Sequence, residues 1–143
     1  MSGGDYISFT VPGPPEGKRR PRTRVFGRRA TIYTDPKDKA YEAKVAAGAK
    51  VAMMGRAPWE GPLVVMVKAW LQVPASASAP RKLRIMDGVE DWFGPSDIDN
   101  YLKAVLDGCN GVVWVDDRQV MRAITEKAPT IYGGHVDVVV VRS

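Results

Sequence analysis

Alternation of apolar and polar residues predicts strands at both ends of the chain and in its middle. Residues 6–11 alternate regularly, which is typical of a half-buried strand. Residues 63–73 are apolar at one set of alternate positions and largely apolar at the other set, which predicts a central strand. The pattern predicts four further strands, the first two paired as a hairpin: residues 24–26, 31–34, 118–127 and 135–141.

Capping residues and helical periodicity predict helices between these strands. Asp35 is suited to an N-cap and Pro36 to the first helical position. A helix is therefore expected from there to about Met54, with Gly55 ending it. A second, short helix is expected over residues 78–86.

A third helix is expected from about Ile98 to Asp107 or Gly108. Its apolar residues share one arc at about 100° per residue, which predicts a side that faces the core. That side comprises Ile98, Leu102, Val105, Leu106 and Cys109. A polar stripe with i, i+4, i+8 spacing follows the edge of this arc: Asp99, Lys103 and Asp107.

Strands and helices are interleaved without a regular repeat, which predicts an α+β fold. We expect one domain over residues 1–143, in which a mixed β-sheet packs against two main helices. A chain of 143 residues is long enough to bury a core of its own.

Composition narrows the class of protein. The net charge is +5, which favours nucleic acid or another anionic partner. A single cysteine, Cys109, excludes an internal disulfide and suggests a reducing compartment. No apolar run approaches the roughly 18 residues of a membrane span, and the first residues lack a signal-peptide pattern, so we expect a cytoplasmic protein.

A basic segment follows the first strand. Seven of the twelve residues from 18 to 29 are Lys or Arg. A solvated loop is one interpretation; the density of charge favours contact with backbone phosphates rather than base reading. The candidate DNA-binding residues are Lys18, Arg19, Arg20, Arg22, Arg24, Arg28 and Arg29.

Carboxylates gather in the otherwise basic chain at residues 97–117. Each has an ordinary explanation: helix capping for Asp97, an i,i+4 ion pair between Asp99 and Lys103, and a turn at Asp116 and Asp117. Taken together these explanations require several coincidences. The alternative is a metal site, because carboxylate oxygens without His or Cys suit Mg²⁺, or Mn²⁺ as a substitute.

Other chemistries fit less well. One Cys and one His are too few for a zinc site, and the chain has no Walker A loop. His135 begins a predicted strand and Cys109 continues an apolar helix side, so neither suggests a nucleophilic triad. Asp35-Pro36-Lys37 matches a restriction-type nuclease motif only nominally, because Pro36 begins a helix where that motif needs a strand.

One sequence pattern extends from the third predicted helix, which begins at about Ile98, into the turn that follows it. Its members are Asp97, Asp99, Asn100, Lys103, Asp107, Gly111, Trp114, Asp116, Asp117, Gln119 and Val120. The pattern resembles the RusA family of Holliday junction resolvases, endodeoxyribonucleases of bacteria and their phages. Members of that family are Mg²⁺-dependent homodimers that nick two symmetric strands of a four-way DNA junction.

The resemblance implies a role for each matching residue. Asp97, Asp99 and Asp117 would be metal-binding, catalytic carboxylates, Asp116 a supporting metal ligand and Lys103 the catalytic lysine. We therefore expect a Mg²⁺-dependent endodeoxyribonuclease that resolves branched DNA. The alternatives are an inactive module that binds branched DNA, a metal-dependent nuclease without junction specificity, and a structural protein whose acids are caps and turns.

Overall fold

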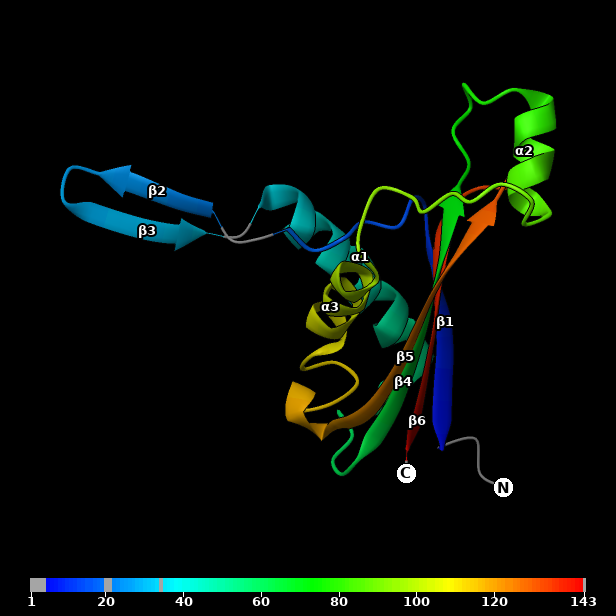
Figure 1. Ribbon diagram of the computed structural model, residues 1–143. Helices are drawn as coiled ribbons and strands as arrows, with labels where there is room; N and C mark the ends of the chain where they lie inside the picture. The colour runs from blue at the N-terminus through cyan, green and yellow to red at the C-terminus, as the bar shows by residue number, and fades with distance from the viewer. Residues whose placement is uncertain (1–4, 20–21, 34, 143) are drawn as a thin grey trace.

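The computed structural model describes residues 5–19, 22–33 and 35–142. Figure 1 shows the arrangement of the elements along the chain. In chain order they are β1 (Tyr6–Pro12), β2 (Arg22–Phe26), β3 (Arg29–Tyr33), α1 (Pro36–Met53), β4 (Leu63–Gln72), α2 (Ala79–Met86), α3 (Ile98–Cys109), the 3₁₀ turn η1 (Asp117–Gln119), β5 (Val120–Thr130) and β6 (His135–Arg142).

Four of the strands form one mixed sheet in the order β1-β6-β4-β5. Strand β4 runs parallel to β5 and antiparallel to β6, and β6 runs antiparallel to β1. A parallel pair needs a crossover between its strands, and the chain from α2 to η1 supplies it. The predicted mixed α+β fold and the interior position of β4 are confirmed.

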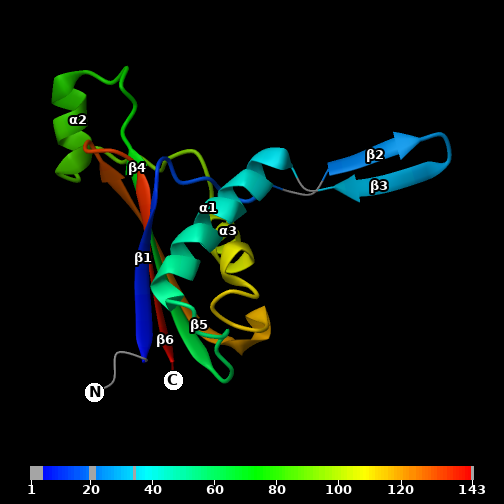
Figure 2. The same ribbon diagram turned by 180° about the vertical axis from the view of Figure 1, so that it is seen from behind.

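The core lies between this sheet and helices α1 and α3, which cover one of its faces (Figures 1 and 2). On β4 the buried positions alternate, as predicted: Leu63, Val65, Val67, Ala69 and Leu71. The intervening side chains on the opposite face are only half-buried. Helix α2 lies away from α1 and α3, near the carboxyl ends of β4 and β5.

The predicted hairpin is confirmed as a separate two-stranded sheet. Strands β2 and β3 pair in antiparallel register, with Arg24 opposite Thr31 and Phe26 opposite Arg29. Figures 1 and 2 show the hairpin projecting from the body of the molecule. Val25 is 66% exposed and Ile32 is 71% exposed, because the projecting strands have no core of their own to cover them.

Helix α1 begins and ends as the sequence predicts. The Asp35 carboxylate accepts a hydrogen bond from the Lys37 backbone N–H at 2.8 Å, and Pro36 occupies the first turn. Met54 adopts a left-handed conformation with φ of 51°, and Gly55 follows with φ of 77°. No described helix is long and apolar enough to cross a lipid bilayer.

The predicted core side of α3 needs a correction. Val105 and Cys109 are buried as expected, but Ile98 is 42% exposed. The buried residues share i, i+3, i+4, i+7, i+8 spacing and are Tyr101, Ala104, Val105, Gly108 and Cys109. The helix is rotated relative to the prediction because Gly108 packs directly on α1, where a Cβ atom would lie 2.5 Å from the Val45 Cβ.

Candidate functional site

A pocket of about 890 Å³ opens beside the first turns of α3. One wall is the segment of residues 15–19 that follows β1, and the other is α3 with the residues just before it. The two walls touch directly: the Lys18 backbone N–H donates to the Asn100 carbonyl at 3.0 Å. Gly17 permits this approach, because a Cβ there would lie 2.9 Å from the Ser96 Oγ.

The polar stripe predicted on α3 lines this pocket. Asp99, Lys103 and Asp107 all border it, one helical turn apart. Asp99 and Lys103 form no ion pair with each other or with another described residue. The i,i+4 ion pair that would explain their spacing by helix stability alone is therefore absent from the described structure.

Asp97 also borders the pocket, at the position that precedes α3. Its backbone has the extended conformation of an N-cap, but its side chain accepts no capping hydrogen bond. Capping therefore does not account for this carboxylate, which is exposed at the pocket with its oxygens free of described protein partners.

Asp117, the first residue of η1, borders the same pocket from the segment that follows α3. The preceding loop is held by Gln119. Its side-chain oxygen accepts the backbone N–H groups of Val115 and Asp116, each at 2.9 Å, and its nitrogen donates to the carbonyls of Trp59 and Gly61 at 2.8 and 3.0 Å. The side chain of Gln119 thus ties this loop to residues 59–61, which precede β4.

Asp116 is not brought to the pocket, although it adjoins Asp117 in sequence. It is the N-cap of η1, and its carboxylate accepts the Arg118 backbone N–H at 2.8 Å and pairs with the Arg118 guanidinium at 3.2 Å. These hydrogen bonds, the backbone one first, lower the pKa of Asp116. The structure therefore places this predicted metal ligand in a capping turn, apart from Asp97, Asp99 and Asp117.

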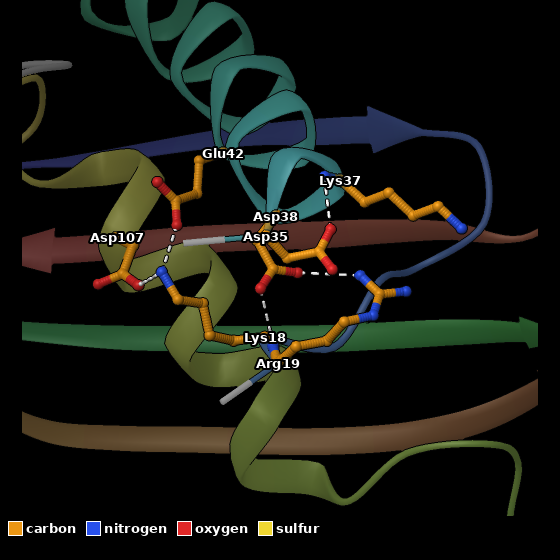
Figure 3. Close-up of polar contacts among 7 residues, drawn as sticks. All are labelled: Lys18, Arg19, Asp35, Lys37, Asp38, Glu42 and Asp107. Carbon is orange, nitrogen blue, oxygen red and sulfur yellow. Dashed lines mark hydrogen bonds and ion pairs between the residues drawn. The ribbon is translucent and has the colours of Figure 1, made fainter. Parts of the chain in front are cut away.

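Two of the predicted DNA-binding residues are engaged within the protein (Figure 3). The Lys18 ammonium lies 2.5 Å from Glu42 and 2.8 Å from Asp107, so it joins α1 to α3. Burial alone would lower the pKa of Lys18, but the two carboxylates outweigh burial and raise it. Arg19 bonds the buried Asp38 through both its backbone N–H and its guanidinium, each at 3.0 Å.

Four of the remaining basic residues lie on the projecting hairpin. Arg28 and Arg29 are exposed at its turn. Arg22 and Arg24 lie in β2, and Arg20 lies outside the described residues. The predicted phosphate-binding segment is thus divided between a pair that fastens the pocket wall and a group on the hairpin.

The donor set at the pocket suits a hard cation. Asp97, Asp99 and Asp117 offer only oxygen atoms, and no described Lys, Arg or His lies within ion-pair distance of them. Among the described residues, no three His, Cys, Asp or Glu side chains are grouped closely enough to hold a metal ion. A cation bound by these carboxylates would therefore need waters and substrate phosphate oxygens to complete its shell, as Mg²⁺ commonly does.

Cys109 lies behind this site, in the core side of α3. It is fully buried, and burial together with the charge of Asp117 raises the pKa of its thiol to about 12. The prediction that Cys109 serves packing rather than nucleophilic attack is thus consistent with its environment.

Sequence reasoning did not identify two contributors to the pocket. Of the segment of residues 15–19, only Lys18 and Arg19 belong to the predicted DNA-binding stretch, and the sequence does not predict that the segment forms a pocket wall. Trp114, whose buried indole N–H donates to the Asp117 Oδ1 at 2.7 Å, was noted only as part of a motif. The only feature of the sequence that could have indicated this contact is that Trp114 lies three residues before Asp117.

Comparisons with known proteins identify the family of this chain. The family profile described as "Endodeoxyribonuclease RusA" matches residues 12–141, nearly the whole chain. The chain is also 31% identical over 121 residues to a Bacillus subtilis (strain 168) protein with the printed name "Uncharacterized protein YqaN", covering 82% of this chain and 83% of that protein. The fold, the site and the extent of these matches lead to one conclusion: the chain belongs to the RusA endodeoxyribonuclease family.

Proposed function

We propose that this protein is a Mg²⁺-dependent endodeoxyribonuclease that resolves Holliday junctions and other branched DNA by paired symmetric nicks. Family membership supports a nuclease that acts on DNA junctions. The observation that carries the proposal is the gathering of Asp97, Asp99, Lys103 and Asp117 at one pocket, from two separate segments of the chain. Such a protein would act where bacterial or phage DNA recombines, in the cytoplasm.

Asp97, Asp99 and Asp117 would hold the cation. When bound, Mg²⁺ polarises a phosphodiester and lowers the pKa of a coordinated water, with Mn²⁺ as a possible substitute. The three carboxylates lack described protein cations, so their negative charge is available to a metal ion. Asp116 would support the site indirectly, by capping the turn that carries Asp117.

Lys103 would stabilise the negative charge that develops on the phosphate. Its side chain is exposed, borders the pocket and forms no ion pair with Asp99 or Asp107. Asp107 is paired with Lys18 instead, which leaves the Lys103 ammonium free to meet a substrate oxygen. Lys103 and the three carboxylates are therefore the proposed catalytic residues.

We further infer that the protein acts as a homodimer. A four-way junction has near two-fold symmetry, and two copies of one site would place a nick on each of two equivalent strands. Arg22, Arg24, Arg28 and Arg29 on the hairpin would contact phosphates beyond the pocket.

The proposal is tested by Asp97→Asn, which keeps the shape of the side chain and removes its charge. Cleavage of a labelled four-way junction should fall by at least about 100-fold, because a metal ligand is lost, while junction binding stays equal or becomes tighter. The measurement is a cleavage assay with and without Mg²⁺ beside a gel-shift titration without metal. Asp87→Asn, which changes an exposed carboxylate at the end of α2 and outside the pocket, is the matched control and should retain most of the activity.

The possible outcomes separate the candidate functions. Paired symmetric nicks that need both Mg²⁺ and Asp97, with linear duplex untouched, would establish a resolvase. Junction binding without cleavage in Mg²⁺ or Mn²⁺ would indicate a binding module. Equal cleavage of duplex and junction would indicate a metal-dependent nuclease without junction specificity.

A further inference from the structure

Trp114 connects the hydrophobic core to the pocket through a single hydrogen bond. Its side chain is 0% exposed, and its indole Nε1–H donates to Oδ1 of Asp117 at 2.7 Å. Asp117 itself is half-buried and borders the pocket. The bond therefore runs from a residue that packing immobilises to a carboxylate that faces the solvent-filled site.

The indole cannot easily move away from this bond. Its backbone is held by a hydrogen bond from the Gly111 N–H to the Trp114 carbonyl at 2.8 Å, and the neighbouring Val113 carbonyl accepts the Trp59 N–H at 2.7 Å. A buried indole N–H without an acceptor is destabilising, because its hydrogen bond to water is lost on folding and is not replaced. Since Asp117 is the acceptor that the structure gives it, core packing and the position of this carboxylate are coupled.

The same bond restrains the orientation of the Asp117 carboxylate. A carboxylate turns about its Cβ–Cγ bond with a broad, two-fold preference, so packing alone does not fix it. Trp114 holds Oδ1, while Oδ2 makes no hydrogen bond to a described residue. Gln119 holds the backbone of this loop, and Trp114 adds control of the side chain.

We propose that Trp114 is a positioning residue of the nuclease site, which holds Asp117 through its indole N–H so that the opposite carboxylate oxygen is presented to a divalent cation. The inference rests on the proposed function and deepens it. It assigns the N–H group, rather than the bulk of the ring, as the part of Trp114 that the metal site requires.

Two replacements at position 114 separate the N–H from the ring. Trp114→Phe removes the donor and part of the volume, and β-(3-benzothienyl)alanine, introduced at the same position, replaces N–H by sulfur at nearly the same volume. Trp70→Phe is the matched control, because it also removes an indole-to-aspartate hydrogen bond, to Asp137 at 3.0 Å, outside the pocket.

Electron paramagnetic resonance measures the binding of Mn²⁺ to the full chain in the absence of DNA. Thermal unfolding verifies that each variant is folded. Both position-114 variants should bind Mn²⁺ about tenfold more weakly, as expected when an outer-shell hydrogen bond to a ligand is lost. The benzothienyl variant should unfold near the wild-type temperature, and Trp70→Phe should bind Mn²⁺ like the wild type. In cleavage assays, the half-saturating Mn²⁺ concentration should rise in parallel.

Wild-type Mn²⁺ affinity in the benzothienyl variant would overturn the inference, even if Trp114→Phe is weakened, because ring packing rather than the N–H would then be responsible. That result would leave the nuclease proposal intact. Absence of Mn²⁺ binding by the wild-type chain, or binding unaffected by Asp97→Asn, would instead overturn the metal site and with it this inference.

Discussion

At the scale of single residues, Gly108 decides how closely the two main helices pack. A Cβ atom at this position would lie 2.5 Å from the Val45 Cβ and 3.0 Å from the Glu42 backbone oxygen. Rotation of the Val45 side chain does not move its Cβ atom, and the Glu42 oxygen belongs to the backbone, so no side-chain rotation can relieve this contact. Because α3 carries Asp99 and Lys103, the same contact fixes the position of half of the proposed site.

We therefore expect Gly108→Ala to destabilise the protein by about 1–3 kcal/mol, the usual cost of overpacking, in spite of the higher helix propensity of alanine. Equilibrium urea unfolding measures this. Gly48→Ala in α1 is the matched control: its Cβ would meet the Phe9 ring at 2.8 Å, and a ring on the edge strand can rotate away, whereas the Val45 Cβ and the Glu42 backbone oxygen cannot. Equal stability of the two variants would contradict the close-packing argument.

At the scale of elements, the basic segment performs two different tasks. Its first residues fasten the pocket wall, since Lys18 bridges Glu42 and Asp107, and Arg19 is paired with the buried Asp38. The part that follows forms the projecting hairpin, with Arg28 and Arg29 exposed at its turn. Phosphate contact is therefore a prediction best tested on the hairpin.

The double variant Arg28→Ala/Arg29→Ala should weaken junction binding while leaving stability unchanged, because both side chains are exposed. Each lost phosphate contact should reduce the slope of log K against log salt by about one. Fluorescence anisotropy across a salt series measures affinity and slope together. Lys82→Ala on α2, away from the pocket, is the control; an unchanged slope in the double variant would contradict hairpin contact with phosphates.

At the scale of the whole molecule, the sheet has one face covered by helices and one that α1 and α3 leave open (Figure 2). A groove of about 200 Å³ crosses the open face, bordered by Met66, Ile124 and Val139. Charges of both signs also border it: Lys68 on β4 lies in register between Glu126 of β5 and Asp137 of β6, and its ammonium is 3.7 Å from the Glu126 carboxylate. Such a surface can be self-complementary about a two-fold axis, as a symmetric dimer requires.

If the homodimer forms through this face, Val139→Glu should shift the protein from dimer to monomer, because the new carboxylates would face each other across the axis without partners. Sedimentation velocity over a concentration series measures the shift, and circular dichroism confirms the fold. Tyr132→Glu, in an exposed loop outside the groove, is the control. A wild-type monomer, or a Val139→Glu dimer of unchanged stability, would exclude this interface.

Local rules in the sequence were sufficient for most elements. Capping by Asp35 and Pro36, the alternation in residues 6–11 and the largely apolar run at residues 63–73 identify structures that depend on neighbouring residues alone. The i, i+4, i+8 spacing likewise placed Asp99, Lys103 and Asp107 on one side of α3, where they all border the pocket.

Tertiary structure decided what local rules could not. The core side of α3 is set by the close packing of Gly108 on Val45 of α1, which hydropathy does not register, so Ile98 is exposed and Tyr101 is buried. Adjacent carboxylates at 116 and 117 are separated in role because one caps a turn and the other meets a buried indole. The sequence by itself determined which elements form and which chemical groups are present; the three-dimensional packing decided which of those groups face one pocket, because that depends on contacts between residues far apart in the chain.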